Sequence, residues 1–214
     1  MSAAGQGHDR PLRRDAARNQ QLVIAAARQV IAESGTDACM EAIAARAGVG
    51  VGTVYRRFPS KDALISELVR LILDELILAA REALSRGDGS GLEIFLRALG
   101  RSFLEHRPYA VKLMDATGSD CAGTLRGLIA DLHGQAQQHL LIAAHVTLAD
   151  IMATAWALRG VVETTGAVAP HAWERHLDIH LAGLRSPSTP GIRPSIAPRR
   201  PARITGTNSA ENNA

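Results

Sequence analysis

The chain has 214 residues, of which 46% are hydrophobic, 21% charged and only 3% aromatic, and its formal net charge is +3. This composition is typical of a globular protein and excludes a fully disordered chain. No apolar run reaches the roughly 20 residues that a membrane span needs, the basic N-terminus lacks the apolar segment of a signal peptide, and two cysteines make no disulfide framework, so we expect a soluble, cytoplasmic protein with no membrane partner.

The long segments of the chain show helical spacing of apolar residues, and sustained two-residue alternation is absent. A first helix is expected from about Asp15 to Glu33, and a short second one over 40–47. Glycines then mark a turn before a third short helix that ends near Phe58. Ser60 is a good N-cap for a long fourth helix. The stripe expected to face the core of the first helix is Val23, Ala26, Ala27, Val30 and Ile31.

The remaining residues predict further helices over Leu92–His106, Tyr109–Thr117 and Leu125–Ala143. Thr147 would cap the next helix, and a last helix would begin at Pro170 and end at Leu184. We therefore expect an all-α fold of about nine helices. The segment 186–214 is rich in proline and has no apolar period, so it is predicted to be disordered.

Charge is unevenly distributed along the chain. Residues 10–61 hold nine arginines and lysines against four acidic residues, whereas residues 62–184 hold ten against fifteen. A basic first domain on an acidic body suits a polyanion such as nucleic acid, because each neutralised phosphate releases condensed counterions. Charge alone leaves open a compositional drift in a chain that uses arginine far more than lysine.

Residues 39–58 read CMEAIAARAGVGVGTVYRRF, which has the spacing of a helix-turn-helix. Ala44 is small where the two helices would cross, Gly48 suits a left-handed turn, and Val54 would close the core from the second helix. Such a motif can place its second helix in the major groove of DNA.

The stretch RNQQLVIAAARQVIAESGTDACMEAIAARAGVGVGTVYRRFPSKDALISELV, nearly all of residues 18–69, resembles the TetR family of bacterial transcriptional regulators. The Tyr-Arg-Arg-Phe-Pro-Ser-Lys segment within it is highly specific to that family. Residues 173–185, WERHLDIHLAGLR, are similar to the last helix of many members. Residues 75–145 resemble the family only in helix count.

The resemblance implies an N-terminal three-helix DNA-binding domain joined by a long helix to an α-helical ligand-binding and dimerisation domain. It implies a homodimer that binds a palindromic double-stranded DNA operator, as a repressor released by a small ligand that the sequence does not identify. The expected parts are a flexible basic arm (1–15), the DNA-binding domain (16–76), the effector and dimerisation domain (77–185) and the tail (186–214).

By position, the resemblance places the recognition helix over about Val51–Phe58. Thr53 and Arg56 would face base edges or nearby phosphates, while the other side chains hold the DNA backbone and Gly52 brings a backbone amide close to it. The expected DNA contacts are Gly52, Thr53, Tyr55, Arg56, Arg57 and Lys61.

Some positions leave alternatives open or depart from the family. Tyr55 could instead be a core aromatic that packs under Phe58. Many relatives carry Ser or Thr where Cys39 stands, and Cys39 is a poorer helix cap. Many also have a polar or basic residue where Val51 stands, and Val51 offers only apolar contact, for example with a thymine methyl. These departures affect the expected operator sequence rather than DNA binding itself.

The arginines expected before the first helix, among them Arg13, Arg14 and Arg18, have two interpretations. They form an arm that enters the minor groove, or a flexible solvated start that adds nonspecific affinity. The basic tail has the same two interpretations.

The body offers candidates for a ligand pocket, although a helical core needs the same residue types. His176 and His180 have a spacing that suits a metal, but no acidic or cysteine cluster accompanies them, and the alternative is a pair at the dimer interface. Cys39 and Cys121 are redox sensors or, alternatively, structural thiols. We expect no metal and no cofactor. The candidate pocket residues are Phe95, Phe103, Met114 and Trp156.

A second apolar stripe predicts that the last two helices, over about 147–184, form the dimer interface. On this interpretation a charge at Leu177 separates the subunits and leaves the N-terminal helices folded. The stripe comprises Leu148, Ile151, Ala155, Leu158 and Val162 on one helix and Trp173, Leu177, His180, Leu181 and Leu184 on the next.

No nucleophile–base pair, phosphate-binding loop or paired acids appear, so a regulator that is not an enzyme is expected. Two other classes remain open. One is an α-helical enzyme that the helix-turn-helix only delivers to DNA, although Ser102 and Tyr109 have only Arg101 and Arg107 nearby. The other is a helical protein-interaction module that uses the motif for packing.

Overall fold

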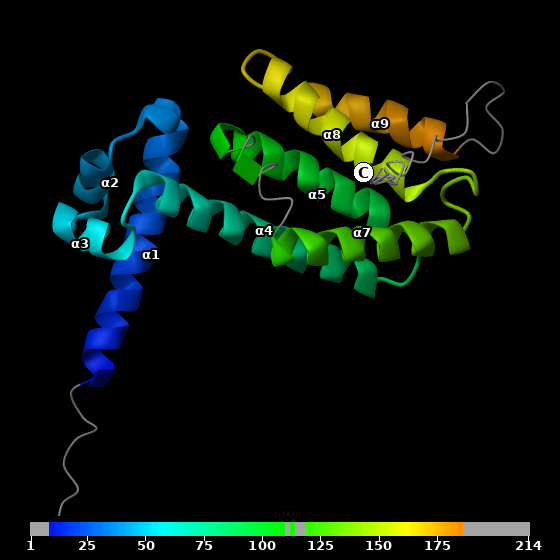
Figure 1. The fold of residues 1–214 in the computed structure, drawn as a ribbon. Coiled ribbons are helices and arrows are strands. Elements are labelled where there is room, and N and C mark those ends of the chain that lie inside the picture. Colours follow the sequence, from blue (N-terminus) through cyan, green and yellow to red (C-terminus); the bar gives the residue numbers. More distant parts are fainter. Residues whose placement is uncertain (1–8, 110–111, 114–118, 186–214) are drawn as a thin grey trace, which may run out of the picture.

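The computed structural model describes residues 9–109, 112–113 and 119–185 (Figure 1). Over these ranges the chain forms eight α-helices, two 3-10 turns and no strand, which confirms the all-α expectation. No helix in the described ranges is both long and apolar enough to span a bilayer. The elements are α1 (Asp9–Ser34), η1 (Gly35–Asp37), α2 (Met40–Ala47), α3 (Val51–Arg57), α4 (Lys61–Ser85), α5 (Gly91–Glu105), η2 (Arg107–Tyr109), α7 (Asp120–Gln138), α8 (Leu148–Thr165) and α9 (Ala172–Arg185).

The helices gather into a small head and a larger body, and α4 belongs to both (Figure 1). In the head, α1 packs against α2 and against the start of α4, and α2 packs against α3. In the body, α4 packs against α5 and α7, and α5 also contacts α8 and α9. One continuous helix therefore connects the head to the body.

The core of the head is formed by the stripe that the sequence predicts on α1. All five of its members are buried, and α2 and α3 close the core from the other side. Ser60 caps α4 as expected, since its side chain accepts a hydrogen bond from the backbone N–H of Ala63. Cys39, at the N-cap of α2, makes no such bond, in line with its being a poorer cap.

Helix α1 begins at Asp9 rather than at Asp15, so residues 9–15, which were expected in the flexible arm, belong to the helix. Arg13, Arg14 and Arg18 therefore lie on α1 instead of preceding it. An acidic residue and a proline are both tolerated in the first helical turn, where the N–H groups have no partner within the helix. The predicted arm is thus too long, and its residues 1–8 lie outside the described ranges.

Other boundaries also differ from the sequence expectation. Helix α7 starts at Asp120 rather than Leu125, because Ser119 provides an N-cap that accepts from the backbone N–H of Ala122. It ends at Gln138, and Leu140 has a left-handed φ of 57°, which stops the helix before Ala143. Most of the helix expected over 109–117 and the tail 186–214 lie outside the described residues, and Tyr109 closes the 3-10 turn η2.

The apolar stripe on α8 and α9 does not form an exposed seam. Its central residues face α5 within the same protomer: Leu158 and Leu177 are fully buried, and Trp173 is only 3% exposed. The sequence prediction that these side chains pack across a dimer interface is therefore wrong. Their apolar surface is already removed from water by α5.

Gly100 marks the closest approach of α5 to α9, because a Cβ there would overlap the ring of the buried Trp173. Gly100→Ala is expected to destabilise the fold by about 1–3 kcal/mol, since the packed ring cannot move away freely. Gly127→Ala is the matched control: Gly127 lies inside α7 with nothing near its Cβ position. That substitution should stabilise by about 0.5–1 kcal/mol through helix propensity. Thermal denaturation of both variants checks the opposite signs, and equal shifts would contradict the tight contact.

Candidate functional site

The turn between α2 and α3 has the geometry that the sequence indicates. Gly48 is left-handed, with φ at 67°, and its N–H donates to the carbonyls of Ala44 and Ala45. Val49 donates to the same Ala44 carbonyl at 3.1 Å. Ala44 and Val54 are both buried, at 3% and 0% exposed. The small residue, the left-handed turn and the closing valine together form a compact helix-turn-helix.

An ion pair holds α2 against α1. Both Nη atoms of Arg46 donate to the carboxylate of Glu33, at 3.0 and 2.8 Å, and Arg46 also donates to Gln29 at 3.3 Å. The hydrogen bonds from Arg46 lower the pKa of the Glu33 carboxyl. This exposed ion pair adds to the packing of α2 on α1, and the motif spacing does not reveal it.

One face of α3 is directed to solvent while the other is packed. Val54 and Phe58 are buried, whereas Tyr55 is 43% exposed, so the alternative of a core position for Tyr55 is wrong. Arg56 is exposed and folds along its own helix, donating to the Gly52 carbonyl and to Thr53 Oγ1, each at 3.2 Å. Gly52, Thr53 and Arg56 therefore form one polar surface on α3.

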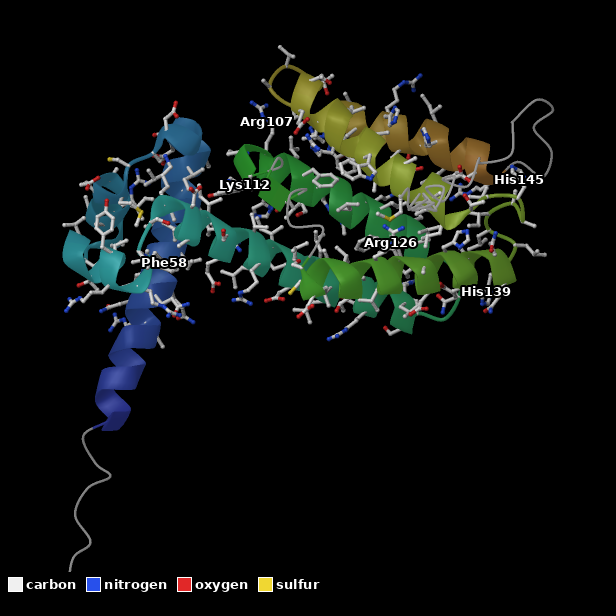
Figure 2. The ribbon with its side chains drawn as sticks, viewed as in Figure 1. Phe58, Arg107, Lys112, Arg126, His139 and His145 are labelled. Atoms are coloured by element: carbon white, nitrogen blue, oxygen red, sulfur yellow. The ribbon has the colours of Figure 1, made fainter. Side chains whose placement is uncertain are left out.

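Arg57, the last residue of α3, and Lys61, the first residue of α4, are not part of this polar surface. Arg57 donates to Gln20 of α1 at 3.0 Å, and its guanidinium lies 5.8 Å from the ring centroid of Phe58 (labelled in Figure 2). Part of its function is therefore to hold α3 against α1, a contact that motif spacing does not reveal. Lys61 is half-buried at the first position of α4, directly after the motif.

The body contains an apolar cavity of about 130 Å³ between α4, α5, α7 and α8. Of the four residues suggested by the sequence, Phe103 and Trp156 line it. Phe95 is fully buried in the core and does not line this cavity. Met114 lies outside the described residues. Arg126 of α7 also lines the cavity, and no motif or apolar period in the sequence indicates it.

Contacts along α4 join this cavity to the head. Leu73 and Leu76 of α4 line the cavity. Between them in the sequence, Glu75 accepts a hydrogen bond from Arg28 of α1 at 2.7 Å. Lys112 lies 3.4 Å from Asp62, in the first turn of α4 (Figure 2). One ion pair, Arg28–Glu75, thus ties the helix that lines the cavity to α1 of the head, and Lys112 joins the first turn of the same helix to the segment after η2.

Outward from the body, α8 and α9 present a face of small and apolar residues. Ala153, Ala157 and Gly160 follow one another at helical spacing on α8, and Ile179 on α9 is 60% exposed. A Cβ at Gly160 or at Gly183 of α9 would meet nothing within 4 Å. We call this face, formed by Ala153, Ala157, Gly160, Ile179 and Gly183, the outer face.

The His176 and His180 rings lie beside the outer face with their centroids 5.0 Å apart. Burial, and secondarily the neighbouring His176, lowers the pKa of His180, so its neutral form is favoured. Within the described part of the chain, no group of three or more His, Cys, Asp or Glu residues is arranged to hold a metal ion. The observed relation between the two histidines is the packing of their rings.

The chain is similar to known proteins both in the sequence of its head and in its overall fold. Residues 23–68 match the family model described as bacterial regulatory proteins, tetR family. No curated protein matches the chain.

Among solved structures, a TetR transcription regulatory protein from Mycobacterium vanbaalenii is 30% identical, with 82% of this chain and 100% of that chain covered and a TM-score of 0.61. A TetR transcriptional regulator from Streptomyces coelicolor is 28% identical, with coverage of 78% and 99% and a TM-score of 0.58. The TetR family regulator PfmR from Thermus thermophilus, at 20% identity, shares the fold, with coverage of 78% and 99% and a TM-score of 0.60. With its helix-turn-helix head and α-helical body, this chain belongs to the TetR family of bacterial transcriptional regulators.

Proposed function

We propose that the protein is a homodimeric repressor that binds a palindromic operator through α3 and is released by a small ligand bound in the body. The observation that carries the proposal is the division of α3 into a buried side and an exposed polar side. Thr53 and Arg56 contact base edges, whereas Tyr55, Arg57 and Lys61 hold phosphates. Residues 16–76 form the DNA-binding domain, and residues 77–185 bind the effector and the second subunit.

The arginine-rich start of α1 adds to this interface. Arg18 is exposed on α1, on the element that Arg57 joins to α3 through Gln20. On a helix, these arginines contribute positive charge along the DNA backbone rather than entering the minor groove as an extended arm.

Binding to the DNA upstream of its own gene tests the proposal. Fluorescence anisotropy across a salt series should give saturable, sequence-specific binding whose affinity falls steeply as salt rises. A DNA-directed enzyme would instead give cleaved or covalently joined DNA. A protein-interaction module would give no specific binding at any salt concentration.

Arg56→Ala should weaken operator binding by about 1–3 kcal/mol and change the order in which single-base operator variants are preferred, because Arg56 reads a base. Lys61→Ala is the matched control: it should weaken all variants about equally and lower the salt slope by about one unit. Anisotropy titrations against a panel of operator variants measure both effects. An unchanged order of preference in Arg56→Ala would assign Arg56 to a phosphate.

The dimer forms through the outer face rather than through the buried stripe. Small residues on α8 allow the helix of a second subunit to approach closely, and Ile179 supplies exposed apolar area for burial. Two helices from each subunit then form a four-helix interface around a twofold axis. This pairing sets the spacing between the two recognition helices and hence between operator half-sites.

Ligand release acts through α4. Because Leu73 and Leu76 line the cavity and Glu75 holds Arg28 of the head, a ligand that displaces this part of α4 changes the orientation of α3. The ligand needs only to bind the DNA-incompetent arrangement more tightly than the DNA-bound one. Titrating a candidate effector into the protein–DNA complex should then lower the anisotropy of labelled operator.

A further inference from the structure

The composition of the cavity indicates what it binds. Of the twelve described residues that line it, eleven are apolar and the twelfth is Arg126. Its volume of about 130 Å³ is close to that of apolar cavities, about 150 Å³, that stay dry and accept benzene. The cavity therefore has room for one aromatic ring or for an alkyl chain of similar volume.

Among the described residues, Arg126 has no acidic partner, unlike Arg70 and Arg159 of the body. Within the described residues, Arg70 pairs with Glu67 and Asp74, and Arg159 pairs with Glu163. Arg126 makes no ion pair or side-chain hydrogen bond there, and the residues one turn away on α7 cannot provide one. Those neighbours are Ala122, Gly123, Ile129 and Ala130.

The position of Arg126 places its charge at the edge of the apolar space. The side chain is exposed, and in Figure 2 it extends from α7 toward α5 and α8. Trp156 of α8 lines the same cavity and is 46% exposed, an unusual state for an indole. An open cavity thus has at its rim a half-exposed indole and a guanidinium that pairs with none of the described residues.

We propose that this cavity binds a small apolar monocarboxylate, with its ring or alkyl chain in the cavity and its carboxylate on Arg126. A guanidinium presents two parallel N–H donors that match two carboxylate oxygens. The described residues of the lining offer no second cation for a doubly charged phosphate, which favours a carboxylate. The inference deepens the proposed function, since it names the chemical class of the effector.

Isothermal titration calorimetry of the full chain without DNA tests the site with four probes: octanoate, 1-octanol, phenylacetate and phenylacetamide. At least one acid should bind tenfold or more tightly than its neutral partner. Arg126→Met, which keeps the length of the side chain, should weaken that acid at least tenfold and remove the preference. Arg81→Met is the matched control, because Arg81 is exposed on α4 and does not line the cavity.

Tryptophan fluorescence gives an independent readout. The chain has two tryptophans, and Trp173 is buried against Gly100, away from the cavity lining. The bound acid should therefore change the emission of the parent and leave Trp156→Phe unchanged. Equal binding of acids and neutral partners, unchanged binding in Arg126→Met, or no binding of either acid would overturn the proposal.

Failure of this proposal is distinguishable from failure of the proposed function. Without ligand, the parent and Arg126→Met should bind operator equally, because Arg126 lies in the body. Acid binding through Arg126 in a protein that binds no DNA would contradict the regulatory function and leave the carboxylate site standing. Operator binding without acid binding would contradict the carboxylate site and leave the regulatory function standing.

Discussion

Ile179→Glu is expected to convert the dimer into a monomer and to abolish tight operator binding. Ile179 is 60% exposed on the protomer and lies on the proposed interface. Because the interface is twofold symmetric, the substitution brings two carboxylates into one apolar contact, where removing their charge from water is costly. We expect the dimer dissociation constant to rise about 100-fold or more, which corresponds to about 2.7 kcal/mol. Sedimentation velocity measures the change.

A matched control separates this effect from a general loss of exposed apolar surface. Leu78 of α4 is 64% exposed and lies away from α8 and α9. Leu78→Glu should therefore remain a dimer with parental affinity for DNA. A stable dimer of parental size in Ile179→Glu would show that the subunits meet elsewhere.

Sequence spacing predicts the head well because its constraints are local. Ala44, Gly48 and Val54 lie within eleven residues of one another, and each position has a steric requirement that few residue types meet. The predicted core stripe on α1 is buried throughout, since a helical period specifies a face without reference to the rest of the chain. Helix ends are predicted less well, because caps such as Ser119 compete with neighbouring alternatives.

Sequence spacing predicts the body less well because it shows that a face is apolar but not what covers it. The apolar stripe through Leu158 and Leu177 has the sequence pattern expected of a dimer interface, and a protomer core gives the same pattern. The outer face, with its small residues, has a weaker apolar signal. In the same way, Phe95 and Phe103 are both aromatic residues of α5, yet only Phe103 reaches the cavity, and only the packing distinguishes them.

Leu177→Glu provides the sharpest test of that distinction, because it lies two residues from Ile179 on the same helix. Leu177 is fully buried against the body, so a glutamate there has no solvent and no partner. We expect a loss of about 4 kcal/mol or more and a melting temperature lower by about 10 °C or more. Leu177→Met, which conserves volume, should cost less than about 1.5 kcal/mol.

The two glutamate substitutions therefore separate a core helix face from an interface helix face. Circular dichroism of Leu177→Glu should show that the body no longer unfolds cooperatively on heating. Ile179→Glu should instead be a monomer that keeps the native helical content. If Leu177→Glu were instead a well-folded monomer with parental melting temperature, α9 would pack on the body through its other side. The apolar stripe through Leu177 would then be the dimer interface. Because Leu177 and Ile179 project about 160° apart on a helix with 3.6 residues per turn, one face cannot serve both contacts.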